Sequence, residues 1–595
     1  MPAALSSLSP LILSIVLFWV CTHLLHRLLA QRTRSLLPTT AALRITSNTL
    51  LAQTTVNLRT AHLVLRTTAL NVSHARLSSS LSQKRNRRSR EVLKRCYDVG
   101  SVLGVIGMAV GLGLVGWTAV QLAGVVAASG RGDVSVADAY EPKTVFAKRD
   151  ALHADTGIRA SADAQVPIHA IIPGLTTPFS HAPLLLLALL FAQLVHEAGH
   201  ALAAALEPVP LLSAGLSLTL VFPSAFVLLA PFSSPSPPSG TSLSSEHMTP
   251  PPTARLRLTA AGAFHNLVLW LVLLPALGRT LWGMCGYREV GGWARVVVCV
   301  DEDSPLAPHL PPGALITYVD DTPLSSASSA GDAWSALLSA YPAQEDALGW
   351  CVPRAWFDEQ PNSCCLPPSQ SHADLQAQLA CFVSQDDGSD TGRCLDPLPL
   401  LSALPNPKAP RRCASASACG SAHEFACVCP GKEERLVRLR VVMPVGEEGR
   451  ERVVVWQGEK EEILEEVEVS TYLPRTRLLP LRLPLLVNAF FTYLLALSLS
   501  LYVFNLLPLS FLDGGQFLDA LLDLFSSFSS VTSGFGDGDV ELGSVGDHMQ
   551  GTVVGEGRAE HGHGRWKRRV LRTAHWVSAG LVGVCALLGT VAALR

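Results

Sequence analysis

Long uncharged apolar segments constrain the fold of this 595-residue chain more than any other feature of its sequence. A helix that crosses a bilayer needs about 20 apolar residues. Only 16% of the residues are charged, against about 25% in soluble proteins, which argues against a soluble enzyme. We therefore predict a polytopic α-helical membrane protein with about six spans, at residues 11–30, 99–130, 173–195, 258–277, 483–512 and 573–594.

A further uncharged stretch, residues 211–232, is interrupted by Gly215, Pro223 and Pro231. Irregular backbone at membrane depth must be covered by protein, so this stretch predicts a re-entrant hairpin or a bent membrane segment. The first apolar segment has the alternative of a cleaved signal peptide. No Lys or Arg precedes it and no convincing cleavage site follows, so a retained membrane anchor is expected.

The segment between the first two spans, residues 31–97, is strongly basic. Short basic loops stay on the cytosolic side of a membrane, so we predict a cytosolic loop here. A nucleic-acid or nuclear-localisation patch is the alternative, but the net charge of -2 provides no global basic field, and no nucleic-acid partner is expected. A second basic cluster before the last span marks another cytosolic face: Arg565, Lys567, Arg568 and Arg569.

Residues 285–481 then lie on the opposite, lumenal side, and nine of the 14 cysteines occur there between Cys351 and Cys429. Cysteine-dense segments are typical of oxidising compartments. A zinc module would need paired C-x2-C spacings, which do not occur, so we expect disulfides of undetermined pairing. Strand-like runs at 294–300 and 313–321, followed by a helix-like run at 333–338, predict a PDZ-like domain that the cysteine-rich stretch interrupts.

Two low-complexity stretches, residues 233–252 and 526–564, are rich in Ser/Pro and in Gly/Ser/Asp respectively and read as flexible loops. The predicted organisation follows the chain in nine parts: an anchor (1–30), a basic cytosolic loop (31–97), a span (98–130), a lumenal linker (131–168), a first part of the membrane core (169–284), a lumenal PDZ-like, cysteine-rich α+β insertion (285–481), a second part of the core (482–525), a Gly-rich cytosolic loop (526–572) and a last span (573–595).

The motif with the clearest chemistry is His196-Glu197-Ala198-Gly199-His200. On a helix the two histidines share one face, where they can hold one Zn²⁺ while Glu197 acts as general base. With 18 histidines in the chain, chance gives roughly 0.02 matches to this motif. An alternative is that the helix has already left the bilayer, but residues 201–206 continue the apolar run. Ionisable residues inside a membrane are functional by default.

A catalytic zinc needs a third protein ligand and an open fourth position. Asp513 ends an otherwise uncharged span, and Gly514 and Gly515 permit a tight turn after it. Pro508 is expected to leave the carbonyl of Phe504 without its helical partner. We predict one Zn²⁺ per chain, with Asp513 as third ligand; the alternative is an aspartate that merely ends a helix.

These motifs together resemble the site-2 protease family of intramembrane zinc metalloproteases. The resemblance rests on the HExxH motif and on the sequence from Asn505 to Gly514, N-x-x-P-x-x-x-L-D-G. Residues 222–226 resemble the family's hairpin, although Ser224 stands where glycine is usual, and Ala-Phe-His-Asn at 263–266 opens the following span as in eukaryotic members. The similarity covers most of residues 98–523, weakly in the soluble part.

The resemblance implies roles for individual residues. His196, His200 and Asp513 would bind zinc, and Glu197 would activate water. Asn266 and Asn505 would hydrogen-bond the substrate backbone or a developing oxyanion, with interhelical hydrogen bonding as the alternative; a structural role is expected for His265.

The function implied is cleavage, within the membrane, of transcription-factor precursors already trimmed on the lumenal side, of the sterol-regulatory-element-binding type. Cleavage would release a cytosolic domain to the nucleus from a multi-pass protein of the endoplasmic reticulum or Golgi. The partners would be these membrane-spanning substrates and the bilayer. A zinc transporter, which would need ligands repeated across several spans, and an inactive scaffold with a PDZ-like module are the alternatives.

Overall fold

The computed structural model describes the greater part of the chain and divides it into two compact units. The described residues are 2–32, 43–44, 54–130, 177, 179–230, 250–276, 279–325, 332–339, 348–365, 379–384, 392–402, 410–420, 424–431, 434–443, 451–476, 478–533 and 556–594. The helical unit comprises Met1–Phe146, Ser161–Ala276 and Phe490–Arg595, and the β-rich unit comprises Ala147–Ala160 and Leu277–Ala489. The predicted linker (131–168) and most of the predicted loop at 233–252 lie outside the described residues. The loop predicted at 526–564 was wrong at both ends, because residues 526–533 and 556–564 are helical; the residues between them lie outside the described part of the chain.

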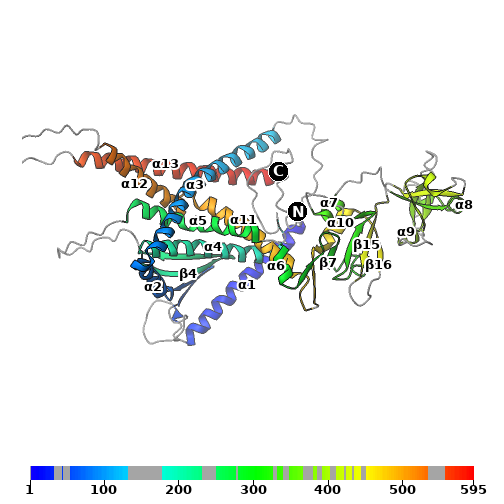
Figure 1. Ribbon diagram of the computed structural model, residues 1–595, viewed down its shortest axis with the longest axis horizontal. Helices are drawn as coiled ribbons and strands as arrows, with labels where there is room; N and C mark the ends of the chain where they lie inside the picture. Colours follow the sequence, from blue (N-terminus) through cyan, green and yellow to red (C-terminus); the bar gives the residue numbers. More distant parts are fainter. Residues whose placement is uncertain are drawn as a thin grey trace, which may run out of the picture. The chain divides into compact units, whose positions relative to one another are not determined.

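Five helices of the described chain are long and apolar enough to cross a membrane, one fewer than the sequence predicts. Their candidate spans lie in α3 (Arg87–Gly130), α4 (Ala182–Leu206), α5 (Pro252–Ala276), α11 (Leu483–Asn505) and α13 (Glu556–Leu594) (Figure 1). The first apolar segment is helical as α1 (Pro2–Arg32), but its described apolar part, Leu13–Leu28, is shorter than these spans.

Close packing in the helical unit depends on glycines of α3. A Cβ at positions 100, 104, 107 or 111 would come within 2.6–3.2 Å of a side-chain atom of α5, α11, α12 (Asp513–Ser533) or the turn before α12. The atoms met belong to Phe264, Phe517, Leu506 and Val503 respectively. Small residues at such spacing allow membrane helices to approach closely, which compensates for the absence of a hydrophobic driving force between them.

Ion pairs connect the same helices around the beginning of α5. Arg255 contacts Asp519 at 2.5 Å and Asp523 at 2.6 Å, and Lys567 of α13 contacts both of these aspartates at 2.6 Å. Arg257 contacts Asp98 of α3 at 2.6 Å and Glu207, directly after α4, at 2.7 Å. These pairs fix α12, and with it Asp513, against α5 and α13.

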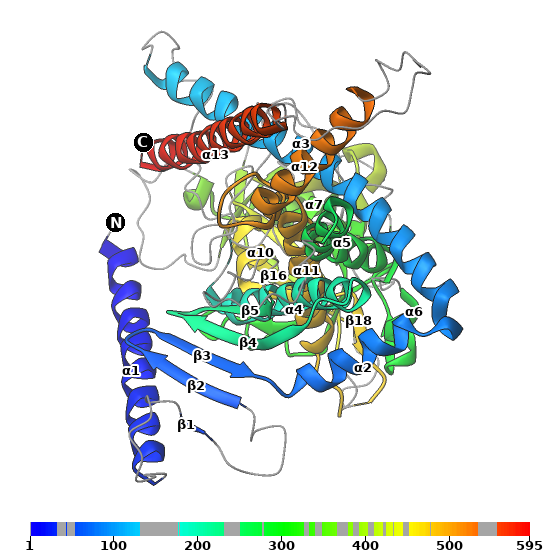
Figure 2. The ribbon, with the colours of Figure 1, turned by 90° about the vertical axis from the view of Figure 1, so that its left-hand side faces the viewer.

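Residues 211–229 form an antiparallel β-hairpin, β4 (Leu211–Thr219) and β5 (Phe222–Leu229), in the stretch for which the sequence predicted a re-entrant hairpin or a bent membrane segment. The hairpin belongs to a sheet with the order β1-β2-β3-β4-β5, in which β5 is the last strand (Figure 2). Strands β1 (Leu43–Arg44), β2 (Thr54–Arg59) and β3 (His62–Thr67), and helix α2 (Leu70–Ser82), come from the segment expected as a basic loop. Ser224, where the family usually has glycine, contacts Ser217 across the hairpin, with 2.5 Å between the hydroxyl oxygens.

Helix α1 contacts the turns of both hairpins in this sheet. The indole N–H of Trp19 donates to the carbonyl of Leu220 at 3.0 Å, and a ring nitrogen of His23 lies 3.1 Å from the carbonyl oxygen of Thr60. The first apolar helix is therefore attached to the sheet through its two-residue turns.

The β-rich unit contains two main sheets, and the cysteine-rich stretch forms one of its own. The first has the order β16-β15-β8-β7-β17 with β9 paired to β8, and the second has the order β12-β11-β14-β10-β13. Because β10 to β14 fall between β9 and β15 in the sequence, the second sheet is an insertion into the first. The strands are β6 (Tyr287–Glu289), β7 (Arg295–Val300), β8 (Leu315–Val319), β9 (Thr322–Pro323), β10 (Gly349–Pro353), β11 (Ala380–Ser384), β12 (Gly392–Leu395), β13 (Arg412–Cys413), β14 (Phe425–Pro430), β15 (Leu436–Val442), β16 (Glu451–Gln457), β17 (Val467–Ser470) and β18 (Tyr472–Pro474).

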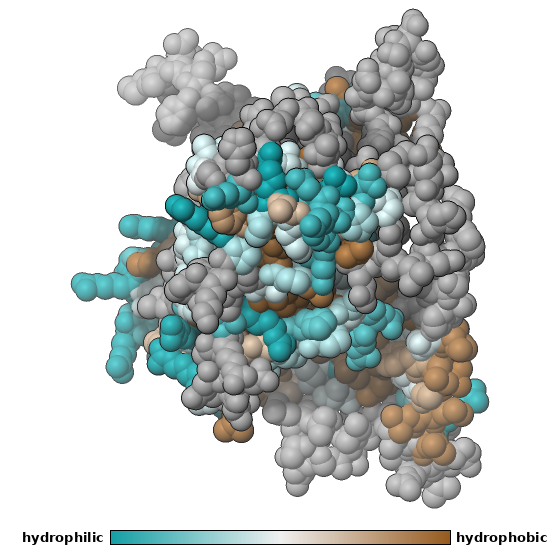
Figure 3. Space-filling view, turned by 90° about the vertical axis from the view of Figure 1, so that its right-hand side faces the viewer, coloured by the Kyte–Doolittle hydropathy of each residue, from teal (hydrophilic) through white to brown (hydrophobic). Residues whose placement is uncertain are grey.

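Five short helices accompany these sheets: α6 (Arg279–Met284), α7 (Ala333–Ser339), α8 (Arg354–Asp358), α9 (Pro397–Leu401) and α10 (Lys460–Glu466). Trp334 and Leu338 of α7 and Ile463 of α10 are buried in the core of the first sheet. Trp350, Phe357 and Phe382 belong to the separate core of the second. Hydrophilic side chains are prominent on the face of this unit that carries α8 and α9 (Figure 3).

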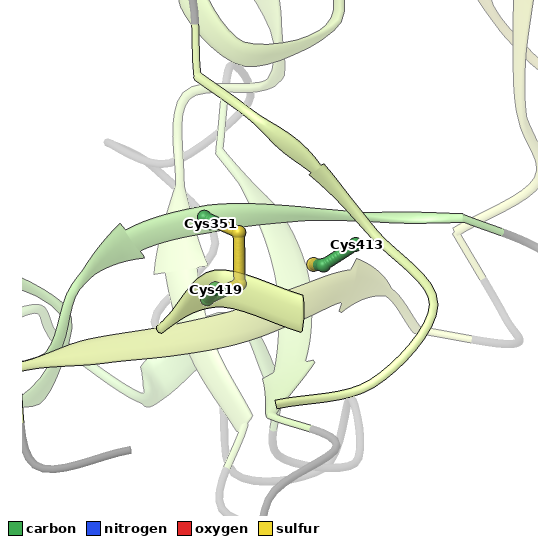
Figure 4. A group of neighbouring side chains, drawn as sticks. All are labelled: Cys351, Cys413 and Cys419. Atoms are coloured by element: carbon green, nitrogen blue, oxygen red, sulfur yellow. A yellow bond between two sulfur atoms is a disulfide. The ribbon is translucent and has the colours of Figure 1, made fainter. Parts of the chain in front are cut away.

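The predicted disulfides are present in the cysteine-rich sheet. Four of them use eight of its nine cysteines: Cys351–Cys419, Cys364–Cys394, Cys365–Cys381 and Cys413–Cys427. Figure 4 shows the Cys351–Cys419 bond with Cys413 beside it. The sulfur atoms of these three residues lie within 4.8 Å of one another, as do those of Cys364, Cys365 and Cys394. Since each group contains disulfide sulfurs rather than thiolates, neither offers a metal the ligands it needs.

Candidate metal centre

The three predicted ligands meet inside the helical unit, although Asp513 lies more than 300 residues from the two histidines in the sequence. His196 and His200 lie one turn apart on α4, and Asp513 reaches them from the start of α12. The carboxylate Oδ2 of Asp513 lies 2.8 Å from Nε2 of His196 and 3.2 Å from Nε2 of His200. The two Nε2 atoms are 3.2 Å apart. Three donor atoms thus surround one point, an arrangement that can hold a metal ion.

The position of Asp513 differs from the predicted one, because it begins a helix instead of ending a span. Helix α11 ends at Asn505, and residues 506–512 form a turn that leads into α12. The carbonyl of Phe504 cannot bond position 508, where proline has no N–H, and instead accepts the N–H of Leu507 at 3.1 Å in a tight final turn. At a helix start the carboxylate of Asp513 is favoured by the positive end of the helix dipole.

The Gly514-Gly515 pair is required by this turn. A Cβ at Gly514 would lie 2.3 Å from the carbonyl oxygens of Leu506 and Leu507, and one at Gly515 would lie 2.3 Å from that of Leu509. These contacts are with backbone, which cannot move aside as a side chain can. The tight turn predicted after Asp513 was wrong in its position: the turn precedes Asp513, and Gly514 and Gly515 lie in the first turn of α12. Glycine is required at both positions because α12 closely approaches the chain that precedes it.

Hydrogen bonds orient both imidazole rings with Nε2 toward the common point. Nδ1 of His200 lies 2.9 Å from the carbonyl oxygen of Leu258, to which it donates its proton. Nδ1 of His196 lies 3.2 Å from the side-chain amide of Asn266. Metal-binding histidines usually donate their second ring N–H to such an acceptor, which fixes the tautomer and the ring orientation.

The hydrogen bonding of Asn266 indicates whether the site fits a metal ion. Its side chain is fully buried, and its Oδ1 has no partner among the described residues, while Nδ2 faces His196. A neutral histidine that binds metal through Nε2 carries its proton on Nδ1 and needs an acceptor there. Turning the amide by 180° exchanges Oδ1 and Nδ2 and preserves the shape of the side chain. Oδ1 then accepts the proton on Nδ1 of His196, so this buried oxygen gains a hydrogen-bond partner. The residues present therefore fit a metal ion.

Gly262 of α5 lies at the site, although it was not among the residues predicted from the sequence. A Cβ at this position would lie 2.4 Å from Nε2 of His200 and 2.5 Å from Nε2 of His196. Any side chain here would take the space of the metal. The available signal was the run of small residues at 260–263, Ala-Ala-Gly-Ala, in a predicted span, since small residues mark close helix contacts.

Glu197 is half-buried between the metal ligands and the hairpin. Its Oε2 accepts the backbone N–H of Val227 in β5 at 2.9 Å. One turn earlier on α4, Oε1 of Gln193 accepts the N–H of Ala225 at 3.0 Å. The candidate general base therefore lies next to the metal ligands and also contacts β5. Gln193, which makes the neighbouring contact with β5, is a second residue that was not predicted from the sequence.

Of the other residues predicted from the sequence, all of which the structure describes, Asn266 lies against the metal ligands and Asn505 and His265 do not bond them. Asn266 contacts His196, whereas Asn505 lies at the end of α11, half-buried, and within the described chain its side chain makes no hydrogen bond to the ligands. Nδ1 of His265 lies 2.9 Å from the carbonyl oxygen of Ala261 in the same helix, and the imidazole ring stacks on Tyr97.

No model of a known protein family matches the chain.

Replacing Asn266 by leucine is expected to lower metal affinity about 10- to 100-fold, the usual cost of losing an outer-shell partner of a ligand. Competition with a chelator on the purified protein measures this. Thr259→Val is the matched control, because Thr259 is also buried on α5 but its hydroxyl donates to the carbonyls of Arg255 and Leu256 in its own helix. Equal affinities of Asn266→Leu and wild type would show that Asn266 does not orient His196.

Proposed function

We propose that this chain is an intramembrane zinc metalloendopeptidase. The observation that carries the proposal is the meeting of His196, His200 and Asp513 beside Glu197, on helices apolar enough to cross a membrane. Donor atoms of a tetrahedral zinc site with bonds of about 2.0–2.1 Å lie roughly 3.3 Å apart. The separations here, 2.8–3.2 Å, are close to this value. Two imidazoles and one carboxylate leave a fourth position for water, as in catalytic zinc sites.

The chemistry divides between the metal and Glu197. When bound, zinc would acidify a water molecule and polarise the scissile carbonyl. Glu197 accepts a proton from the attacking water while the water oxygen bonds to the carbonyl carbon. It then gives this proton to the amide nitrogen as the C–N bond breaks, so that one water is consumed per bond cleaved. Asn266 keeps His196 in the orientation that this requires.

The surroundings of the site favour membrane-spanning substrates. A helical substrate hides its peptide bonds in i→i−4 hydrogen bonds, so it must unwind locally before water can attack. Strand β5 reaches Glu197 through the Val227 N–H and is the last strand of its sheet. An unwound segment can therefore add to the β4–β5 hairpin as a further strand. Asn505 remains a candidate contact for its backbone.

The resemblance to site-2 proteases suggests the substrate class and the compartment. The substrates would be membrane-anchored transcription factors trimmed on the lumenal side, of the sterol-regulatory-element-binding type, in the endoplasmic reticulum or Golgi. Four disulfides suit a lumenal β-rich unit, and the basic segments suit a cytosolic location. The β-rich unit, PDZ-like in the order of its elements, would exclude substrates with bulky lumenal domains.

A zinc transporter would need several ligand groups along a path through the membrane. In the described part of the helical unit, His196, His200 and Asp513 form the single group of this kind. A site with one metal position and an adjacent carboxylate favours catalysis over transport.

Glu197→Gln is expected to reduce release of the cytosolic domain by about 10²- to 10⁴-fold, the usual contribution of a general base. The assay uses cells that lack site-2 protease activity and express a lumenally trimmed, membrane-anchored transcription factor. Zinc content should equal that of wild type. Glu302→Gln, at an exposed position in the β-rich unit, is the control. Equal release by Glu197→Gln would contradict the proposal, and zinc binding without release by wild type would point to transport.

A further inference from the structure

The outer edge of β5 is occupied by two side chains of α4. The N–H groups of Ala225 and Val227 donate to Gln193 and Glu197 at 3.0 and 2.9 Å. Ala225 and Val227 are two residues apart, so their amides share one edge of the strand. Gln193 and Glu197 are four residues apart, so their side chains share one face of the helix. Helix α4 runs along β5 (Figure 2). We call these two hydrogen bonds the edge bonds.

The edge bonds occupy the amides that an added strand would use. In the antiparallel ladder, Val227 pairs with Ala214 and Ala225 pairs with Leu216. Since their N–H groups donate to α4, they point away from β4. An open strand edge is a template for pairing with another chain. Here side chains take the acceptor positions that the carbonyls of an incoming strand would fill, so a strand can add to β5 only after both edge bonds break.

One of the two acceptors is also the candidate general base. The Val227 bond holds one carboxylate oxygen of Glu197, Oε2, against β5. We propose that the substrate itself breaks the edge bonds: two of its backbone carbonyls replace Gln193 and Glu197 on the Ala225 and Val227 amides, and the released Glu197 carboxylate turns to the metal site. This rests on the proposed function. In this proposal Gln193 is a positioning residue that occupies the outer edge of β5 in the substrate-free enzyme.

The direction in which KM changes when Gln193 is replaced distinguishes this role from a structural one. The Gln193–Ala225 bond exists only in the substrate-free state, so it opposes binding. Losing one such hydrogen bond should tighten binding by about two- to tenfold. Leucine has nearly the volume of glutamine and no acceptor, so Gln193→Leu leaves the Ala225 N–H unpaired until substrate arrives. We expect KM to fall about two- to tenfold with kcat within about twofold. A residue that only supported the fold would lower kcat/KM when replaced.

The experiment uses the purified full-length protein in liposomes and a synthetic transmembrane peptide with the sequence of a lumenally trimmed precursor. KM and kcat are measured for wild type, Gln193→Leu and the control Leu194→Ala, whose side chain is exposed on α4. The Kd of the same peptide is measured for Glu197→Gln with and without Gln193→Leu, which gives a readout independent of cleavage. Zinc content and thermal midpoint verify that each variant folds.

Each outcome decides a different point. A lower KM for Gln193→Leu, matched by a lower Kd in the Glu197→Gln background and absent in Leu194→Ala, supports the proposal. A higher KM, or a lower kcat with KM and Kd unchanged, overturns it while the protease function stands. A Gln193→Leu protein that loses zinc or unfolds shows a structural role and overturns it as well. Wild type that binds zinc but neither binds nor cleaves the peptide overturns this inference and the proposed function together.

Discussion

Substituting alanine for Gly262 is expected to reduce metal bound per chain to less than about a tenth of the wild-type amount. The added Cβ would lie 2.4 and 2.5 Å from the two histidine Nε2 atoms, well inside van der Waals contact, at which heavy atoms sit about 3.5–4.0 Å apart. The rings would have to rotate away, which would also break the hydrogen bonds from Nδ1 to Leu258 and Asn266. Elemental analysis of the purified protein measures the loss.

Gly124→Ala is the matched control for this substitution. Gly124 lies in the α3 helix, and a Cβ there meets no atom within 4 Å. This variant should retain its metal, and its helix should gain slightly in stability, since alanine is the better helix former. Full metal content in Gly262→Ala would mean that the metal lies elsewhere than between His196, His200 and Asp513.

Asp513→Asn is expected to weaken metal binding by more than about 100-fold, because losing an outer-shell partner alone costs about 10- to 100-fold. The substitution keeps the shape of the side chain but removes the one negative charge among the three donors. A neutral amide oxygen is a poor third ligand for zinc beside two imidazoles. Metal affinity by chelator competition, measured together with the thermal midpoint, separates this loss from unfolding.

Asp519→Asn provides the control in the same helix. Asp519 contacts Arg255 and Lys567 instead of the metal ligands. Its replacement should lower the thermal midpoint, because two cations lose part of their partner, but should leave metal affinity within about twofold. If both aspartate variants lost metal equally, the effect would arise from displacement of α12 and not from coordination.

The sequence predicted the parts of the site that depend on local periodicity. The spacing of His196 and His200 places them on one face of any helix, and the apolar length of their segment predicts a span. Asp513 was identified because a catalytic zinc beside the HExxH motif needs a third ligand, and this carboxylate follows an otherwise uncharged apolar segment. Its place at the start of α12 was missed, since the sequence does not show that Leu507 N–H closes the final turn of α11 on the carbonyl of Phe504.

Local sequence periodicity does not predict which distant segments pair or pack together. Strands β2 and β3 are short, and β4, the second partner of β3, begins more than 140 residues later, so the five-stranded sheet has no local signature. Gly262 was missed because a glycine in an apolar helix looks the same whether it faces lipid or a metal. The pairing of the cysteines likewise depends on the register of β10, β11 and β14, which only the folded sheet defines.

The distance along the chain between the metal ligands has a consequence for biosynthesis. His196 and Asp513 are 317 residues apart, with the whole β-rich unit between them. A nascent chain that has displayed the HExxH helix lacks its third ligand for roughly 15–60 s, at synthesis rates of about 5–20 residues per second. During that interval the chain holds only two ligands and cannot complete the metal site. In the proposed metalloprotease, metal loading would therefore wait until the β-rich unit has been synthesised.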